Sequence, residues 1–568
     1  MAFIVVALLT VLGAVGCRAK APTESGAGST VASRGGSITT SMRGEPGSFN
    51  RLTASDSGTV LVSALTQAKL VRVNQVSQDV EPWLAESWTS SEDGRRFTMK
   101  LRDAAFSDGT PFTAADVVFT FAALYDEKAN NPLADSLKVA GKPLTVAAVD
   151  RHTVVVTFPV AFAPGVRILD NLPILPRHKL EAALKGGTFK RAWGLSASAS
   201  DIVGLGPFVL VQYVPGQRLV FARNPHYWRK APDGTALPYL DQITAEIIPD
   251  EAAELLRLES GQLDMVFASI APEAYAPIKR AADAGRLKLI DLGVAYEADG
   301  FWINLKPHAF DGDPRAAWLQ RDELRRAISM AVDRKKFSDT VFLGAGVAVY
   351  GPHTPANKVW YWADEPKTPY DPAGARALLA SIGLIDRNGD RMLEDARNQP
   401  ARFSILTQTG RPRLERGAAV IRDDLKNIGI AVDVVTLDAN AVIASIGKGK
   451  YDAIFFNPTW TDTDPAVTPD FWFSSGSFHV WNTEQPTPAT EWERQIDVLM
   501  ARQTASSDMA ERKKLFDDVQ RIFAEHLPMV YFVAPKVILA VSSRMTNLTP
   551  AVIRPNILWS ADTVAVIH

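Results

Sequence analysis

The sequence of 568 residues contains a single cysteine, Cys17. One cysteine excludes an internal disulfide and any structural zinc site built on paired cysteines. No charge of one sign dominates, because 61 Lys and Arg stand against 63 Asp and Glu, for a formal net charge of -2. A dedicated nucleic-acid-binding protein normally carries a strong basic excess, so the composition argues against that class.

Motifs of the common enzyme classes are also absent. The chain has no G-x-S-x-G elbow, no Walker loop, no G-x-G-x-x-G and no H-E-x-x-H. Its eight histidines are scattered, and none pairs with another at metal-ligand spacing. Ser445 and Lys448 have the S-x-x-K spacing of a serine acyl-transfer site, but the companion S-D-N and K-T-G triplets are missing. We therefore expect no catalytic residue, no cofactor and no metal.

One acidic segment resembles the start of a calcium-binding loop. Asp386, Asn388 and Asp390 alternate, and Glu394 lies beyond them. The glycine falls at the fourth position of the segment, whereas a calcium loop needs it at the sixth. A polar turn built from Asp, Asn and Gly is the simpler interpretation.

Long apolar runs are absent except at the start of the chain. Residues 1–16 contain one polar side chain, Thr10, but are shorter than the roughly 18 or more apolar residues of a membrane-spanning helix. The run is typical of a secretory signal peptide. Cys17 follows Gly16, as in a bacterial lipobox, where the signal is removed and lipid is attached to the cysteine. Ala14 stands where leucine is usual, and no Lys or Arg precedes the run, so a plain signal peptide with an incidental cysteine is the alternative.

Residues 17–34 are small and polar and cannot bury enough surface to fold, so they predict a flexible tether. We expect Cys17 to be the lipidation site of a protein anchored to the cell-envelope membrane. The rest of the chain would then work in the periplasm or elsewhere outside the cytoplasm.

After the tether, strand and helix signals alternate. Arg96–Arg102 places Phe97, Met99 and Leu101 on one face at period two, as in a half-buried strand. The same reasoning predicts strands at 153–158, 208–214, 218–222, 243–248, 430–437 and 451–456. Helix starts are predicted at Thr113 with Asp116, at Asp250, at Asp371-Pro372 and at Asp508 with Glu511. Residues from about 300 to 527 alternate helix and strand, which indicates an α/β architecture with more than one core.

Several segments together resemble the family 5 extracellular solute-binding proteins, the oligopeptide, dipeptide and nickel receptors of ATP-driven importers. Residues 81–121 carry the strongest similarity, with PWLAESW, a DG turn, a K-x-R-D strand, F-S-D-G-T-P-F-T and then D-V-V-F. Residues 204–228 resemble the G-x-G-P-F and R-N-P-x-Y-W segments of the family. The resemblance covers essentially all of residues 35–568 in the right order.

The resemblance implies an α/β, two-lobed, periplasmic-binding-protein-like fold of type II with a hinge cleft between the lobes. Lobe I is expected at 35–75, 204–299 and 528–568, with an extra domain at 76–203 packed on it. Lobe II is expected at 300–527, and the signal peptide at 1–16 and the tether at 17–34 precede the folded body.

The resemblance also implies a ligand site. Peptide receptors of this family commonly hold the α-ammonium group of the peptide with an aspartate in a W-x-x-D-Y-x-x-P-like segment, just after a Y-D-x strand. Here Trp460 is followed by Asp462, the best candidate, and by Asp464, the next. The spacing after Trp460 is one residue short and no tyrosine follows, so capping of a loop by the two aspartates is the alternative. Glu45 and Phe49 are expected at the border of the same cleft.

These expectations describe a lipid-anchored receptor of an ABC-type importer. It would be a monomer that closes on a di- or oligopeptide and presents it to permease subunits with cytoplasmic ATPases, with no enzymatic activity and no nucleic-acid partner. A nickel chelate or a sugar oligomer in the same fold stays open as an alternative ligand. A secreted serine hydrolase that uses Ser445 and Lys448 is the alternative from another class.

Overall fold

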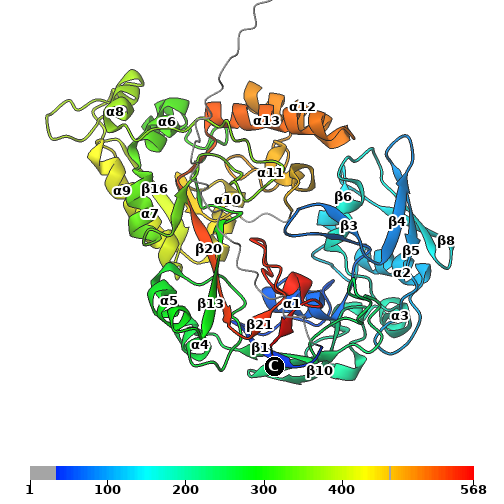
Figure 1. Cartoon of the computed structure of the whole chain (residues 1–568). Coiled ribbons are helices and arrows are strands. Elements are labelled where there is room, and N and C mark those ends of the chain that lie inside the picture. Colours follow the sequence, from blue (N-terminus) through cyan, green and yellow to red (C-terminus); the bar gives the residue numbers. More distant parts are fainter. Residues whose placement is uncertain (1–33, 459–461, 568) are drawn as a thin grey trace, which may run out of the picture.

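The computed structural model describes residues 34–458 and 462–567. The predictions for Cys17 and Trp460 fall on residues outside these ranges. Two sheet-containing parts, here called the first and second lobes, are joined by a pair of long strands (Figure 1).

The first lobe is built on a four-stranded sheet in the order β1-β12-β11-β10. Its strands are β1 (Ser37–Met42), β12 (Gln242–Ile247), β11 (Arg218–Arg223) and β10 (Phe208–Val214). β1 pairs in parallel with β12, and the other neighbours are antiparallel. The strands predicted at 208–214, 218–222 and 243–248 are thereby confirmed. β1 is distant from them in the sequence and completes the sheet by pairing with β12.

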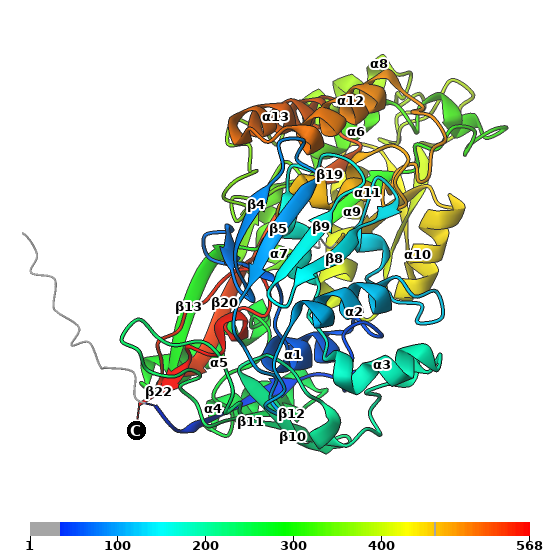
Figure 2. The ribbon, with the colours of Figure 1, turned by 90° about the vertical axis from the view of Figure 1, so that its right-hand side faces the viewer.

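A second four-stranded sheet, in the order β4-β5-β9-β8, faces the viewer in Figure 2. Its strands are β4 (Ala85–Ser90), β5 (Arg96–Leu101), β9 (Thr153–Thr157) and β8 (Thr145–Asp150). Phe97, Met99 and Leu101 are buried while their neighbours on β5 are exposed, as the alternation predicts. The helix α2 (Ala114–Leu124) packs on β8, and the backbone N–H of Thr113 donates to the Asp116 carboxylate at 2.9 Å, which confirms the predicted helix start.

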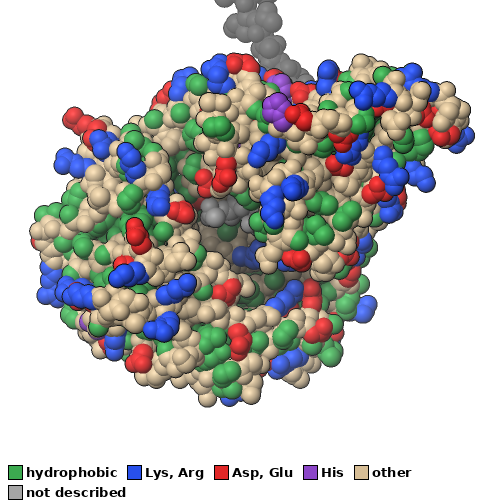
Figure 3. All heavy atoms as spheres, turned by 180° about the vertical axis from the view of Figure 1, so that it is seen from behind, with side chains coloured by type: hydrophobic (Ala, Val, Ile, Leu, Met, Phe, Trp, Pro, Cys, Tyr) green, Lys and Arg blue, Asp and Glu red, His purple; other side chains and the backbone are tan. Residues whose placement is uncertain are grey.

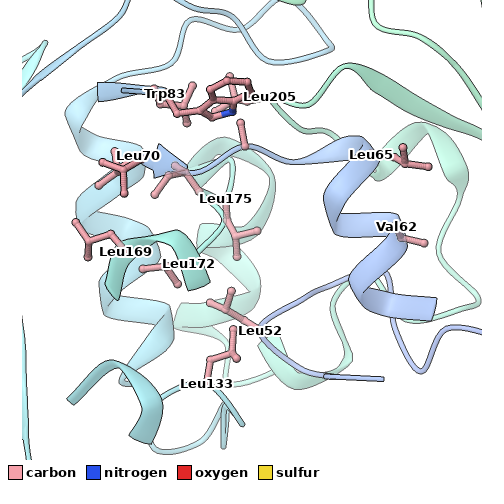
Figure 4. Close-up of a cluster of buried hydrophobic side chains, with 14 of the residues drawn as sticks. Leu52, Val62, Leu65, Leu70, Trp83, Leu133, Leu169, Leu172, Leu175 and Leu205 are labelled. Atoms are coloured by element: carbon pink, nitrogen blue, oxygen red, sulfur yellow. The ribbon is translucent and has the colours of Figure 1, made fainter. Parts of the chain in front are cut away.

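One continuous hydrophobic core joins these two sheets. Side chains from α1 (Ser57–Thr66), from β2 (Val71–Val73) and the loops around it, and from the segment after residue 165 meet there (Figure 4). The residues drawn include Leu52, Val62, Leu65, Leu70, Trp83, Leu133, Leu169, Leu172, Leu175 and Leu205. Because the core is shared, the extra sheet is fixed to the first lobe rather than attached by a linker.

The second lobe contains a five-stranded sheet in the order β17-β16-β18-β14-β19. Its strands are β17 (Ala431–Leu437), β16 (Arg402–Gln408), β18 (Ala453–Phe456), β14 (Gly300–Ile303) and β19 (Met529–Tyr531). β17, β16 and β18 are parallel, and β14 runs antiparallel to its neighbours. β19 extends this sheet beyond residue 527, where the sequence places the end of lobe II.

Both faces of the five-stranded sheet are buried. On β14, Phe301 and Ile303 enter one core, and Trp302 between them enters the other, because successive side chains of a strand point to opposite faces. The first core lies under α6 (Asp322–Ala331), α7 (Arg334–Val341), α8 (Pro372–Ser381) and α9 (Pro412–Asn427). The second lies under α10 (Ala439–Lys448), α11 (Pro469–Trp472), α12 (Glu491–Ala505) and α13 (Met509–His526) and is rich in aromatic rings.

Two paired strands carry the chain between the lobes. β13 (Leu287–Val294) leads into β14 of the second lobe, and β20 (Val533–Ser542) leads back from β19. β13 and β20 pair with each other in antiparallel fashion, with a register shift between Asp291 and Val294. In Figure 1 they run from the part that contains α4 (Glu251–Glu259) and α5 (Tyr275–Asp283) to the part that contains α9.

The remaining elements are short or peripheral: α3 (Arg177–Lys185), β3 (Val80–Pro82), β6 (Lys138–Val139), β7 (Lys142–Pro143), β15 (Gly346–Ala348), β21 (Met545–Thr546) and β22 (Ala565–Val566). Within the described ranges, no helix combines the length and the apolar character needed to cross a membrane.

The G-L-G-P-F motif marks the point where the chain returns to the first lobe. The backbone N–H of Gly206 donates to the carbonyl of Thr66 at the end of α1, at 3.0 Å. A Cβ atom on Gly204 would lie 1.9 Å from that carbonyl oxygen, and one on Gly206 would lie 2.4 Å from the carbonyl carbon. The motif therefore needs glycine because two backbone segments touch there.

We predict that Gly206→Ala lowers the free energy of unfolding by about 1–3 kcal/mol, since the added methyl group has to push the end of α1 away. The change is measured by urea denaturation followed by tryptophan fluorescence. Gly447→Ala is the matched control, because Gly447 lies on α10 with open space around its Cβ position, and it is expected to leave stability unchanged or slightly raised. Equal unfolding curves for Gly206→Ala and the parent would contradict the close-contact explanation.

Candidate functional site

A cleft of about 1990 Å³ lies between the two lobes. The space-filling view from behind shows the molecule hollowed near its centre, with charged side chains of both signs around the opening (Figure 3). The first lobe contributes α1, α4 and the segment 268–277 to the walls, and the second lobe contributes the start of α9, Phe456 and Asp462. Small-molecule pockets usually measure roughly 300–1,000 Å³, so this cleft has room for an extended ligand.

The strand before the predicted anchor is positioned by its own Tyr-Asp pair. Tyr451 donates its hydroxyl hydrogen to the carbonyl of Val480 at 2.7 Å. The carboxylate of Asp452 accepts from Arg315 at 2.8 Å and from the backbone N–H of Ser404 at 2.9 Å. These contacts tie β18 to its surroundings, and Asn457, directly after the strand, lines the cleft.

Asp462 lines the cleft, and its carboxylate already has a cationic partner. The Nε of Arg167 donates to Asp462 Oδ1 at 2.7 Å, and the backbone N–H of Asp464 donates to the same oxygen at 2.8 Å. The side chains of Arg167 and Asp462 are only 10% and 6% exposed. Burial raises the pKa of Asp462, and the Arg167 guanidinium opposes that shift.

Asp464 is engaged in a similar way but does not belong to the cleft wall. Its Oδ1 accepts from Arg512 Nη2 at 2.7 Å and from the backbone N–H of Ala466 at 3.0 Å. The second contact caps the short helical turn Pro465–Val467. Both Asp464 and Arg512 belong to the second lobe.

The remaining predicted residues, Glu45 and Phe49, have internal contacts outside the cleft wall. Glu45 accepts from the Tyr213 hydroxyl at 2.8 Å and from the backbone N–H of Gly216. The hydrogen bond from Gly216 is the main cause that lowers the pKa of Glu45. Phe49 is buried and packs edge-on against Tyr213, with ring centroids 5.4 Å apart. In the stretch from residue 43 to residue 51, which contains Glu45 and Phe49, the residues that line the cleft are Arg43 and Arg51.

Arginines are the cleft residues that the sequence reasoning missed. Arg43 pairs with Glu251 and Glu254, each at 3.0 Å, and Arg413 pairs with the buried Asp299 at 2.8 Å. Arg411, just before α9, lines the cleft without a carboxylate partner among the described residues.

Arg51 lines the cleft too, and its only hydrogen bond within the described chain is the one that it donates to the carbonyl of Ala54. Burial lowers the pKa of Arg51, with Asp56 as a weaker opposing charge.

The sequence does contain a signal for Arg411, which is its place in T-G-R-P-R directly after β16. Ligands of α/β proteins bind outside the carboxyl ends of parallel strands, so a residue at this position is a candidate for the cleft wall.

Two other patterns from the sequence lie away from the cleft. The hydroxyl of Ser445 donates to the carbonyl of Ala441 one turn earlier in α10, at 2.8 Å, and neither Ser445 nor Lys448 lines the cleft. The segment after residue 385 forms a turn in which Asp386 accepts from the backbone N–H of Gly389 at 2.7 Å and Glu394 accepts from that of Arg387 at 2.8 Å. These contacts agree with the polar-turn interpretation.

Comparison with known proteins gives consistent results along the chain. Residues 79–479 match the family described as bacterial extracellular solute-binding proteins, family 5. A probable ABC transporter-binding protein of Deinococcus radiodurans is 27% identical over 510 residues, which cover 85% of this chain and 84% of the relative. The oligopeptide-binding protein AppA of Bacillus subtilis is 25% identical, with 88% and 87% covered. The periplasmic alpha-galactoside-binding protein of Rhizobium meliloti is also 25% identical, with 88% and 75% covered.

Solved structures agree on the fold. The structure of NikA from Brucella suis in complex with Fe(III)-EDTA superposes with a TM-score of 0.77 at 22% identity, and 94% of this chain and 100% of that chain are covered. AppA from Bacillus subtilis in complex with a nonapeptide gives a TM-score of 0.71 at 24% identity, with the same coverage. The fold is therefore the two-lobed fold of these binding proteins, and the chain belongs to the bacterial extracellular solute-binding proteins of family 5.

Proposed function

We propose that this protein is a lipid-anchored substrate-binding receptor of an ABC-type importer and that it binds peptides in the cleft between its lobes. The observation that carries the proposal is the cleft itself. It measures about 1990 Å³ and is lined by both lobes, and its wall combines charged groups with aromatic rings. A di- or oligopeptide fits such a wall, because its ends are charged and its side chains vary.

The chemistry of the wall favours an ionic ligand. Among the lining residues, Lys and Arg outnumber Asp and Glu, and Arg411 has no carboxylate partner within the described ranges. The carboxylate end of a peptide would supply such a partner through a charge-assisted hydrogen bond. Apolar area comes from partly buried rings such as Phe456 and Trp559, which can cover peptide side chains without selecting one.

The alternative ligands are a nickel chelate and a sugar oligomer in the same cleft. The relative named as an alpha-galactoside-binding protein keeps the second of these open. A neutral sugar would leave Arg411 without a counter-charge, so the peptide has the better support. The serine-hydrolase alternative has no support in the geometry, because the Ser445 hydroxyl bonds within its own helix.

To deliver the ligand, the lobes have to close on it, and the permease has to bind the outer surface of the closed receptor. β13 and β20 connect the lobes, and a register shift interrupts their pairing between Asp291 and Val294. We assign the hinge to this pair of strands. The partners are permease subunits with cytoplasmic ATPases, and the receptor acts as a monomer held at the membrane through Cys17.

We predict that native mass spectrometry and calorimetry will detect peptides bound to the purified protein, and that Arg411→Ala weakens peptide binding by about 10- to 100-fold. The loss is expected because the carboxylate end of the peptide loses its cation. An amidated peptide should bind the parent as weakly as the free acid binds Arg411→Ala. Arg402→Ala is the control, since Arg402 is exposed on β16, pairs with Asp433 and does not line the cleft. Binding of an α-galactoside or a nickel chelate in place of every peptide would reject the peptide assignment.

We also predict that cells fed an alkyne fatty acid attach it to the parent protein and not to Cys17→Ser. The substitution removes the only thiol in the chain, so the label has no other cysteine to join. The parent should sediment with membranes and the variant should be released. Equal labelling and equal sedimentation of the two proteins would contradict the lipid anchor.

A further inference from the structure

The ion pair between Arg167 and Asp462 connects the two lobes. Arg167 lies in the helical turn Gly165–Asn171, where Val166, Ile168 and Leu169 are buried in the core of the first lobe. Asp462 lies in the second lobe, in the segment after β18. The guanidinium group therefore reaches across from one lobe to a carboxylate in the wall of the other.

The same guanidinium group is bound at each of its nitrogens. Nε donates to Asp462 Oδ1 and Nη2 donates to Thr463 Oγ1. Nη1 donates to the backbone carbonyl of Gln78 at 2.7 Å. The side chain of Gln78 then reaches the second lobe itself, because it donates to the carbonyl of Ala356 at 2.7 Å and accepts from the backbone N–H of Lys358 at 3.0 Å.

The segment that carries Asp462 is held independently of Arg167. The hydroxyl of Tyr296 donates to the backbone carbonyl of Asp462 at 3.1 Å. Asn357 donates to the carbonyl of Thr463 at 2.9 Å and to the Tyr296 hydroxyl at 3.1 Å. The backbone that carries the carboxylate is thus held by Asn357 of the second lobe and by Tyr296, which follows the connecting strand β13, and Arg167 meets the carboxylate there.

We propose that Arg167 is an internal counter-ion that occupies the place of a ligand ammonium at Asp462. The ion pair of Arg167 and Asp462 then joins the lobes, and the cleft selects its ligand without binding a free amino group at Asp462. This inference rests on the proposed function of peptide binding in the cleft, and it reassigns Asp462 from ligand contact to contact between the lobes.

The physical reason is the cost of leaving a buried charge alone. A ligand ammonium that took Asp462 would have to displace a guanidinium group that is only 10% exposed. The displaced cation would lose its counter-charge and its hydrogen bonds to Thr463 and Gln78. Asp464 offers no substitute, because Arg512 occupies it at the same distance of 2.7 Å.

The pair of Arg512 and Asp464 provides a matched control. Its side chains are 3% and 6% exposed, and the two atoms are 2.7 Å apart, as in the pair of Arg167 and Asp462. The difference is that Arg512 and Asp464 belong to one lobe. Changes in both pairs should affect stability, but only the pair that crosses between the lobes should affect their arrangement.

The first test uses small-angle X-ray scattering on protein freed of ligand by unfolding and refolding. The double variant Arg167→Gln/Asp462→Asn removes both charges, so it leaves no unpaired buried ion that could prevent folding. We expect its radius of gyration to exceed that of the parent, and the double variant Arg512→Gln/Asp464→Asn to match the parent. An unchanged radius for Arg167→Gln/Asp462→Asn would overturn the proposal, whatever the ligand proves to be.

The second test compares each bound peptide with its N-acetylated form by calorimetry. The parent should bind the two forms with affinities within about threefold of each other, and Arg167→Met, which frees Asp462, should prefer the free amine by more than about tenfold. A parent that loses more than about tenfold on acetylation would overturn the proposal. If no peptide binds the parent in either form, the proposed function fails, and the scattering result still decides the role of Arg167.

Discussion

A buried charge is stable only beside a counter-charge, and this requirement determines how the space between the lobes is built. Asp299, Asp462 and Asp464 are all buried beside the cleft or in its wall, and each lies within 2.8 Å of an arginine. The arginines come from different places: Arg413 from α9, Arg512 from α13 and Arg167 from the other lobe. The cleft is thus assembled around ion pairs that the chain completes by itself.

Local order in this protein could be predicted from the sequence because its signals are local. The alternation in Arg96–Leu101 and the caps at Asp250 and Asp508 involve neighbours within a few residues, and the structure has a strand and two helices there. The two-lobed fold followed from motif segments, and Gly206 gives one of them a physical reason, since its backbone touches that of Thr66. A close contact between backbones tolerates few substitutions, so such a motif stays recognisable.

The candidate site could be predicted only in part, since its partners are distant in the sequence. The position of Asp462 in the cleft wall follows from its place after β18. Its pairing with Arg167 has no sequence signal, because the two residues are 295 positions apart and belong to different lobes. The sequence predicts Glu45 and Phe49 at the border of the cleft, but Arg43 and Arg51 line it, and Phe49 is buried in the core of the first lobe. Which side chain of a loop faces a cleft depends on packing that no short pattern contains.

The shared core of the first lobe has a consequence for the order in which the protein can form. β1 near the start of the chain pairs with β12, and Val564 and Val566 at the far end enter the same hydrophobic core. The second lobe uses an almost continuous stretch of chain, from β14 to β19. All residues of the second lobe therefore precede the last strands of the first lobe in the chain, so the first lobe cannot be completed until the end of the chain is available. The first lobe therefore depends on both ends of the folded body, whereas the second depends on one stretch of chain between them.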